Sequence, residues 1–123
     1  MITTNSIPEL IRNWAASIQK RDASLMTNFY TKDAILIGTY SEPIEVGKNE
    51  IYRYFKTFLN KQGLTCKIQS NINQILYCGL IISSGTYIFR YEGKEVVARY
   101  SFCLREHNGM PKIINHHSSE IPE

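Results

Sequence analysis

One stretch near the end of the sequence, from Lys94 to Ser119, restricts the possible folds more than any other. It contains two segments of strand-like composition, 94–104 and 112–119, on either side of Asn108-Gly109. This dipeptide favours the left-handed backbone conformations that a tight hairpin turn requires. The stretch therefore predicts two antiparallel strands folded back on each other, and a domain built around a sheet.

The first half of the chain has the helical period instead. The first predicted helix has an apolar face whose members recur every three or four residues: Ile7, Leu10, Ile11, Trp14 and Ile18. Ser6 and Glu9 fit a capping box at its start. Asp22 can cap a second, shorter helix that ends at residues 32–33. A third helix is expected over residues 48–62.

Beyond the third helix the period changes to two, which indicates strands. In segment 64–73 the residues expected on the buried face alternate with polar ones: Leu64, Cys66, Ile68, Ser70 and Ile72. A second long strand is expected over 80–91, and a short buried strand over 34–37. This order indicates a single α+β domain over residues 1–123, with three N-terminal helices packed on a curved, mainly antiparallel sheet. Such a sheet encloses a cavity, a usual position for a small-molecule site.

Composition and charge exclude several classes of protein. The formal charge is only +3 and the 14 Lys and Arg residues are scattered, so no nucleic-acid partner is expected. No run approaches the roughly 20 apolar residues of a membrane span, and the first residues do not resemble a signal peptide. Cys66, Cys78 and Cys103 lack metal-ligand spacing and indicate buried thiols in a reducing cytoplasm. We therefore expect a cytoplasmic protein with no metal, cofactor or membrane partner.

The predicted hairpin also carries the candidate ligand-binding residues, which are Arg99, His116, His117 and Ser118. Arg99 lies mid-strand among apolar residues, and its guanidinium suits a carboxylate or phosphate. If the turn holds an even number of residues, Arg99 lies opposite Ser118, with His116 on the same face. One β-bulge would exchange the histidines, so both stay candidates, with His116 preferred. Alternatively, Arg99 pairs with an internal acid or reaches solvent, and the histidines are structural.

Four stretches resemble a known group of proteins: 47–55, 84–89, 98–102 and the closing 116–123, which begins His-His-Ser-Ser. Together with the element order, they resemble the NTF2-like cone fold, which includes the SnoaL-like proteins. They are similar to bacterial stand-alone proteins related to the association domain of calcium/calmodulin-dependent protein kinase II, also classed as SgcJ/EcaC-like. The resemblance implies a cone pocket and oligomerisation. No kinase catalytic motif occurs in the sequence. In the kinase domains an arginine follows the final histidine, where this chain has Ser118.

Two functions are consistent with these features. The first is a non-catalytic module that forms a homodimer or higher oligomer and binds a small anionic molecule in its cone. Its dimer contact is expected on a sheet face that carries four aromatic residues: Tyr87, Phe89, Tyr100 and Phe102. The second is a small SnoaL-like enzyme that performs acid–base chemistry on a carbonyl or polyketide-like compound, with a histidine as the proton-transfer group. Many catalytic members of the fold place an acid near the pocket mouth, where this chain has Asp33.

Overall fold

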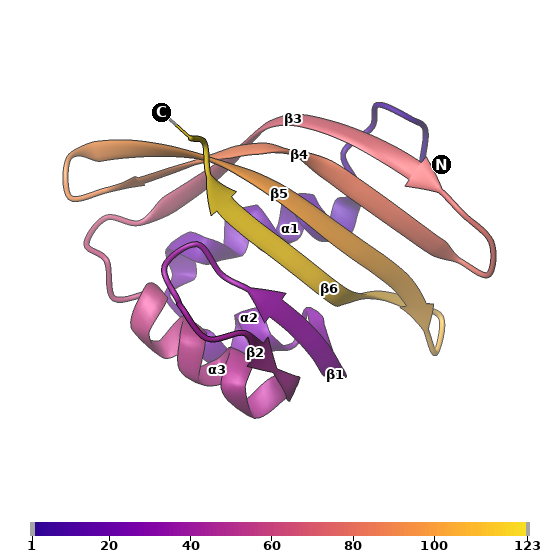
Figure 1. Ribbon diagram of the computed structural model, residues 1–123, viewed down its shortest axis with the longest axis horizontal. Coiled ribbons are helices and arrows are strands. Elements are labelled where there is room, and N and C mark those ends of the chain that lie inside the picture. The colour runs from indigo at the N-terminus through magenta and orange to yellow at the C-terminus, as the bar shows by residue number, and fades with distance from the viewer. Residues whose placement is uncertain (1, 123) are drawn as a thin grey trace.

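The computed structural model describes residues 2–122 of the chain (Figure 1). Its helices are α1 (Glu9–Ser17), the short 3-10 turn η1 (Ile18–Lys20), α2 (Ala23–Thr27) and α3 (Gly47–Phe58). Its strands are β1 (Tyr30–Ile37), β2 (Glu45–Val46), β3 (Thr65–Ile75), β4 (Leu80–Tyr91), β5 (Lys94–His107) and β6 (Met110–Glu120). None of these helices is long and apolar enough to cross a membrane.

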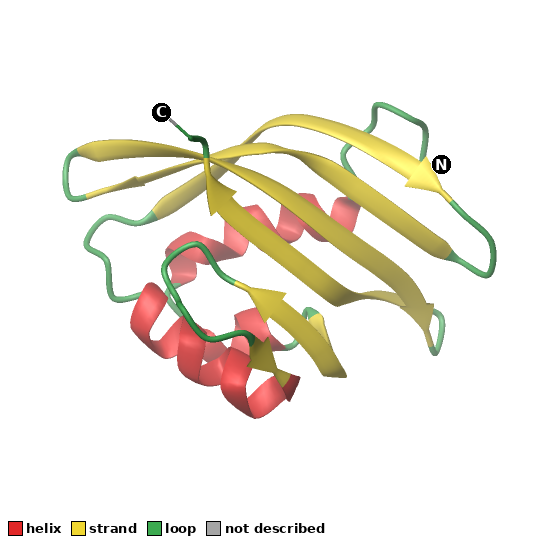
Figure 2. Ribbon diagram, in the orientation of Figure 1, coloured by secondary structure: helices red, strands yellow, loops and turns green. Residues whose placement is uncertain are grey.

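The strands form one six-stranded sheet in the order β2-β1-β6-β5-β4-β3. Strands β1 and β6 are parallel, and every other neighbouring pair is antiparallel. The sheet is curved, and the helices all lie on its concave side (Figure 2). The predicted α+β class, with three helices against a curved and mainly antiparallel sheet, is confirmed.

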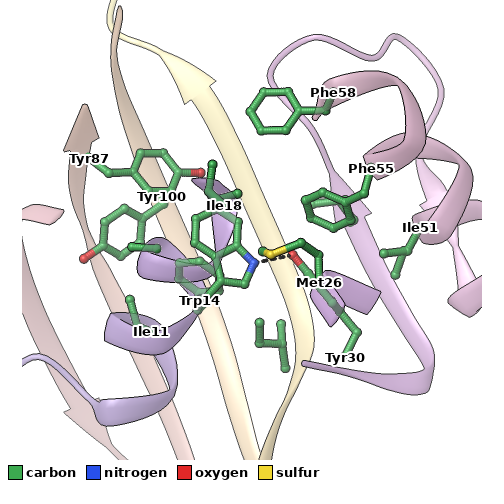
Figure 3. Close-up of a cluster of buried hydrophobic side chains, with 14 of the residues drawn as sticks. Ile11, Trp14, Ile18, Met26, Tyr30, Ile51, Phe55, Phe58, Tyr87 and Tyr100 are labelled. Carbon is green, nitrogen blue, oxygen red and sulfur yellow. Dashed lines mark hydrogen bonds between the residues drawn. The ribbon is translucent and has the colours of Figure 1, made fainter. Parts of the chain in front are cut away.

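The core between the helices and the sheet is aromatic (Figure 3). Trp14 of α1 stacks on Tyr87 of β4 with ring centres 5.7 Å apart, and Phe58 of α3 meets Phe89 edge-on at 5.4 Å. The four residues assigned to an outer dimer face are all buried in this core: Tyr87, Phe89, Tyr100 and Phe102. That assignment was wrong because both faces of β4 and β5 carry apolar residues, and the aromatic face is the one that fills the space beneath the helices.

A bulge in β3 reverses the predicted inward face of that strand. The pairing with β4 shifts between Ile68 and Ser70. Beyond it Asn71 and Asn73 point inward, while Ile72, expected to be buried, is 59% exposed. The inward amide of Asn73 bonds to the N-terminal segment: its Nδ2 donates to the carbonyls of Thr3 at 2.8 Å and Ser6 at 2.7 Å. The bulge therefore attaches the N-terminal segment to the sheet.

Several predicted helix boundaries differ from the structure. Asp22 caps α2 as expected, accepting from Leu25 N at 3.1 Å. The first helix, however, begins after Pro8 without the expected Ser6 cap. Residues 32–33 lie inside β1, which starts already at Tyr30. Helix α3 ends at Phe58, four residues early, and the Arg21 guanidinium donates to two carbonyls that follow, Leu59 O and Asn60 O, each at 3.1 Å.

Candidate functional site

The β5–β6 hairpin places the candidate residues. Its turn is the expected Asn108-Gly109, both with positive φ, at 53° and 79°. Farther along, Leu104 pairs with Ile113 but Cys103 pairs with Asn115, so one extra residue lies between these pairs in β6. This bulge changes the register of the end of β6 by one residue.

The bulge separates the four candidate residues into two pairs. Arg99 lies opposite Ser119, and His117 lies opposite Ser101, both exposed on the convex face. His116 and Ser118 are buried on the concave face. The prediction that Arg99 points into the cone was wrong because its strand neighbours, Ala98 and Tyr100, are the residues that fill the interior. The preference for His116 as the inward histidine is confirmed, although it does not share a face with Arg99.

Inside the cone, His116 is enclosed by aromatic side chains. Its Nδ1 lies 2.9 Å from the Tyr30 hydroxyl, and its Nε2 lies 3.2 Å from the Tyr87 hydroxyl. The imidazole stacks on Phe102 with ring centres 3.9 Å apart. Sequence reasoning missed both tyrosines, since Tyr30 was assigned to a helix and Tyr87 to the outer face. A signal was available in the sequence, because a tyrosine at a core-facing position usually finds a hydrogen-bond partner for its hydroxyl.

The hydrogen bonds continue on both sides of His116. Trp14 Nε1 donates to the Tyr30 hydroxyl at 3.1 Å, the dashed line in Figure 3. On the other side, the Tyr87 hydroxyl donates to Ser118 Oγ, which lies 2.6 Å from Thr39 Oγ1. We call this continuous set the tyrosine–histidine network; its members are Trp14, Tyr30, His116, Tyr87, Ser118 and Thr39.

The network is electrically neutral near pH 7. Burial, with a smaller effect of the neighbouring His117, lowers the pKa of His116 to about 3. Burial also raises the pKa of Tyr30 and of Tyr87 well above the usual tyrosine range. Desolvation disfavours each charged form. These groups can therefore donate and accept hydrogen bonds, but none of them exchanges a proton readily at neutral pH.

A small cavity lies beside the network. Its volume is about 10 Å³, room for about one water molecule. Besides network members, it is lined by aromatic and aliphatic residues: Leu36, Tyr54, Phe55, Phe58 and Phe89. Two of these, Tyr54 and Phe58, also line an outer groove of about 340 Å³. Their stacked rings, 5.6 Å apart, separate the interior of the cone from this groove.

The outer groove carries the charges that the interior lacks. Arg53 and Lys61 line it, together with Glu45, whose carboxylate accepts from Ser41 Oγ at 2.6 Å. The Lys61 ammonium lies 4.7 Å from the ring centre of Tyr40. The groove therefore offers cations and aromatic surface together, which suits an anion with an aromatic body.

Other chemistries find little support in the described part of the chain. Asp33 is exposed on β1, where it accepts from Thr31 Oγ1 at 3.2 Å, and it does not line the cavity. Among the side chains that the structure describes, no group of three His, Cys, Asp or Glu is placed to hold a metal ion.

Comparisons with known proteins agree with this architecture. The profile of the SnoaL-like domain matches residues 7–123. A structure from Xanthomonas campestris, described as a candidate calcium/calmodulin dependent protein kinase II association domain, is 27% identical, with a TM-score of 0.87 over 99% of this chain and 96% of that chain. An NTF2-like protein of unknown function from Pseudomonas putida is 14% identical (TM-score 0.82; 94% and 84% covered). A candidate NTF2-like dehydratase from Streptomyces avermitilis is 10% identical (0.82; 94% and 93%). No curated protein matches the sequence.

Proposed function

The chain belongs to the SnoaL-like family, and we propose that it is a non-catalytic oligomerising module whose cone binds a small anionic molecule. The observation that carries the non-catalytic part of the proposal is the environment of His116. This histidine is the one ionisable candidate inside the cone, and it is neutral with both ring nitrogens bonded to tyrosines.

The same observation weakens the alternative of acid–base catalysis on a carbonyl or polyketide-like compound. A general acid or base works best with a pKa near the operating pH, whereas the pKa of His116 is lowered to about 3. The described residues that line the cavity include no carboxylate to replace it. The likeness to the Streptomyces protein, at 10% identity, supports a shared fold and not a shared reaction.

The convex face of the sheet supports association between copies of the chain. Its centre is small and polar, with Ser84 and Ser101 bonded across strands at 3.3 Å, and Arg99 and His117 beside them. Exposed or partly exposed aliphatic residues flank this centre: Ile72, Ile82, Ile88 and Val97. A two-fold pair of such faces would bury these residues against each other. The Xanthomonas relative is also described as an association domain. In this proposal Arg99 and His117 belong to the contact and not to the pocket.

The anion is proposed to bind at the mouth of the cone, where Arg53 and Lys61 line the groove outside Tyr54. Benzoate is the simplest probe, because it combines one carboxylate with one ring. Calorimetric titration should show binding to the wild type and at least about tenfold weaker binding to Arg53→Ala, which loses a charge-assisted contact. Arg99→Ala is the matched control, since it removes an arginine from the opposite face, and its affinity should be unchanged. Equal affinity in all three proteins would refute binding at this mouth.

A further inference from the structure

The tyrosine–histidine network has a fixed direction, which follows from its first member. An indole N–H can only donate, so the Tyr30 oxygen accepts from Trp14 Nε1 at 3.1 Å. The proton of the Tyr30 hydroxyl then has one partner among the bonds of the described residues, His116 Nδ1 at 2.9 Å. Tyr30 therefore donates to Nδ1.

The direction continues through the imidazole. A neutral histidine has one N–H and one acceptor nitrogen. Because Nδ1 accepts, the proton is on Nε2, which donates to the Tyr87 oxygen at 3.2 Å. The Tyr87 hydroxyl donates to Ser118, and Ser118 is left to donate to Thr39 Oγ1 at 2.6 Å.

The opposite tautomer leaves two buried polar groups without partners. With the proton on Nδ1, the Tyr30 oxygen would accept from both Trp14 and His116, and its own proton would have no acceptor. Nε2 would also have no donor, because the Tyr87 proton goes to Ser118. Buried polar groups left without partners are costly and rare in folded proteins. Trp14 thereby fixes the donor and the acceptor of every hydrogen bond in the network as far as Thr39.

Thr39 is the last member of the tyrosine–histidine network, and its side chain borders the small cavity. Its hydroxyl proton has no acceptor among the described residues. We propose that Thr39 Oγ1 is a preset hydrogen-bond donor that selects ligands carrying an acceptor oxygen, specifically an uncharged carbonyl on an aromatic body. This inference rests on the proposed function, because it names the part of the anionic ligand that enters the cone.

The choice of an uncharged carbonyl follows from the lining. The cavity of about 10 Å³ accommodates one oxygen-sized group, and its described walls carry no cation. A carboxylate there would lose its hydration and gain only the Thr39 hydroxyl, with no cation to offset the buried charge. The carboxylate of the ligand therefore stays in the outer groove with Arg53 and Lys61. The aromatic ring of the ligand lies between the groove and the small cavity, at the position that the Tyr54 side chain occupies. Tyr54 must rotate outward to admit it. The ligand class is an aromatic acid with a carbonyl group remote from its carboxylate.

Two probes of nearly identical shape test the donor. In 4-acetylbenzoate a carbonyl oxygen is available, and in 4-isopropenylbenzoate a CH₂ group replaces that oxygen. Wild-type protein should bind the acetyl compound about fivefold more tightly, the value of one net hydrogen bond. Thr39→Ser keeps the hydroxyl and should keep the preference. Thr39→Val, of the same shape, should lose this preference and bind the acetyl compound no more tightly than the isopropenyl compound.

The outcomes separate this inference from the proposed function. If Thr39→Val retains the preference, or wild type binds both probes equally, the donor role is refuted while anion binding stands. If neither probe binds, both proposals fail. A second measurement is independent of any ligand: a long-range ¹H–¹⁵N correlation spectrum should show the proton of His116 on Nε2. A proton on Nδ1 would contradict the donor direction derived for the network and would overturn the inference.

Discussion

At His116, burial and hydrogen bonding combine to keep an imidazole neutral. The ring contacts Phe102 face to face and Trp14 edge-on, and it bonds to two tyrosine hydroxyls that are themselves uncharged. Protonation would place a cation among these groups and would require one tyrosine to stop donating. The consequence is a stability that depends on pH.

The pKa of His116 is lowered to about 3 in the folded protein, against about 6.5 for an unfolded histidine. Between these values the unfolded chain binds the extra proton, so stability rises with pH and is lost on acidification. We expect urea unfolding free energies to fall by up to about 1.4 kcal/mol per pH unit from pH 6 to pH 4.

The contribution of His116 can be isolated with two variants. His116→Gln cannot titrate, so its unfolding free energy should depend less steeply on pH over the same interval, although the variant is less stable overall. His117→Gln removes the exposed neighbour and should keep the wild-type slope. Identical slopes in wild type and His116→Gln would show that the histidine is not the buried neutral group described here.

At the scale of elements, the two bulges determine which residues of β3 and β6 face the interior. The hairpin turn, the long strands and the cap at Asp22 could be predicted, because local backbone preferences and alternation set them. The extra residue in β6 has no such signal, since residues 113 and 114 are both isoleucine and either could continue a regular strand. Alternation alone also leaves open which face of a strand is the inner one when both are apolar, as in β4 and β5. For that reason the sequence left two choices for the inward face of β6, one with His116 and Ser118 and one with His117. For the same reason Arg99 was assigned to the wrong face of β5.

The bulge in β3 gives a prediction of its own. Asn73 donates to two carbonyls of the N-terminal segment, and its Oδ1 accepts from Ser83 at 2.6 Å. Asn73→Ala removes these bonds and leaves the Ser83 hydroxyl without its buried partner. Unfolding free energy should drop by about 2 to 4 kcal/mol, and amides of residues 3–6 should exchange faster with solvent. Gln74→Ala, at the exposed neighbouring position, should change neither; a loss as large as that of Asn73→Ala would contradict the assigned role.

At the scale of the whole molecule, the two sides of the sheet differ in character. The concave side is closed by helices over a neutral network, and a charged groove lies at its mouth. The convex side is an uncovered sheet with small polar residues in its centre and aliphatic residues around them. We propose small-molecule binding on the concave side and association between copies on the convex side, so a change on one side should leave the other function intact.

Sedimentation velocity at micromolar concentration tests the association directly. Wild-type protein is expected to sediment as a dimer or larger assembly. Ser101→Lys places a second cation beside Arg99 at the centre of the convex face, so two copies would repel each other, and this variant should sediment as a folded monomer. Ser24→Lys adds the same charge at an exposed position of α2 and should sediment like wild type. A monomeric wild type, or an assembly that Ser101→Lys leaves intact, would contradict the account.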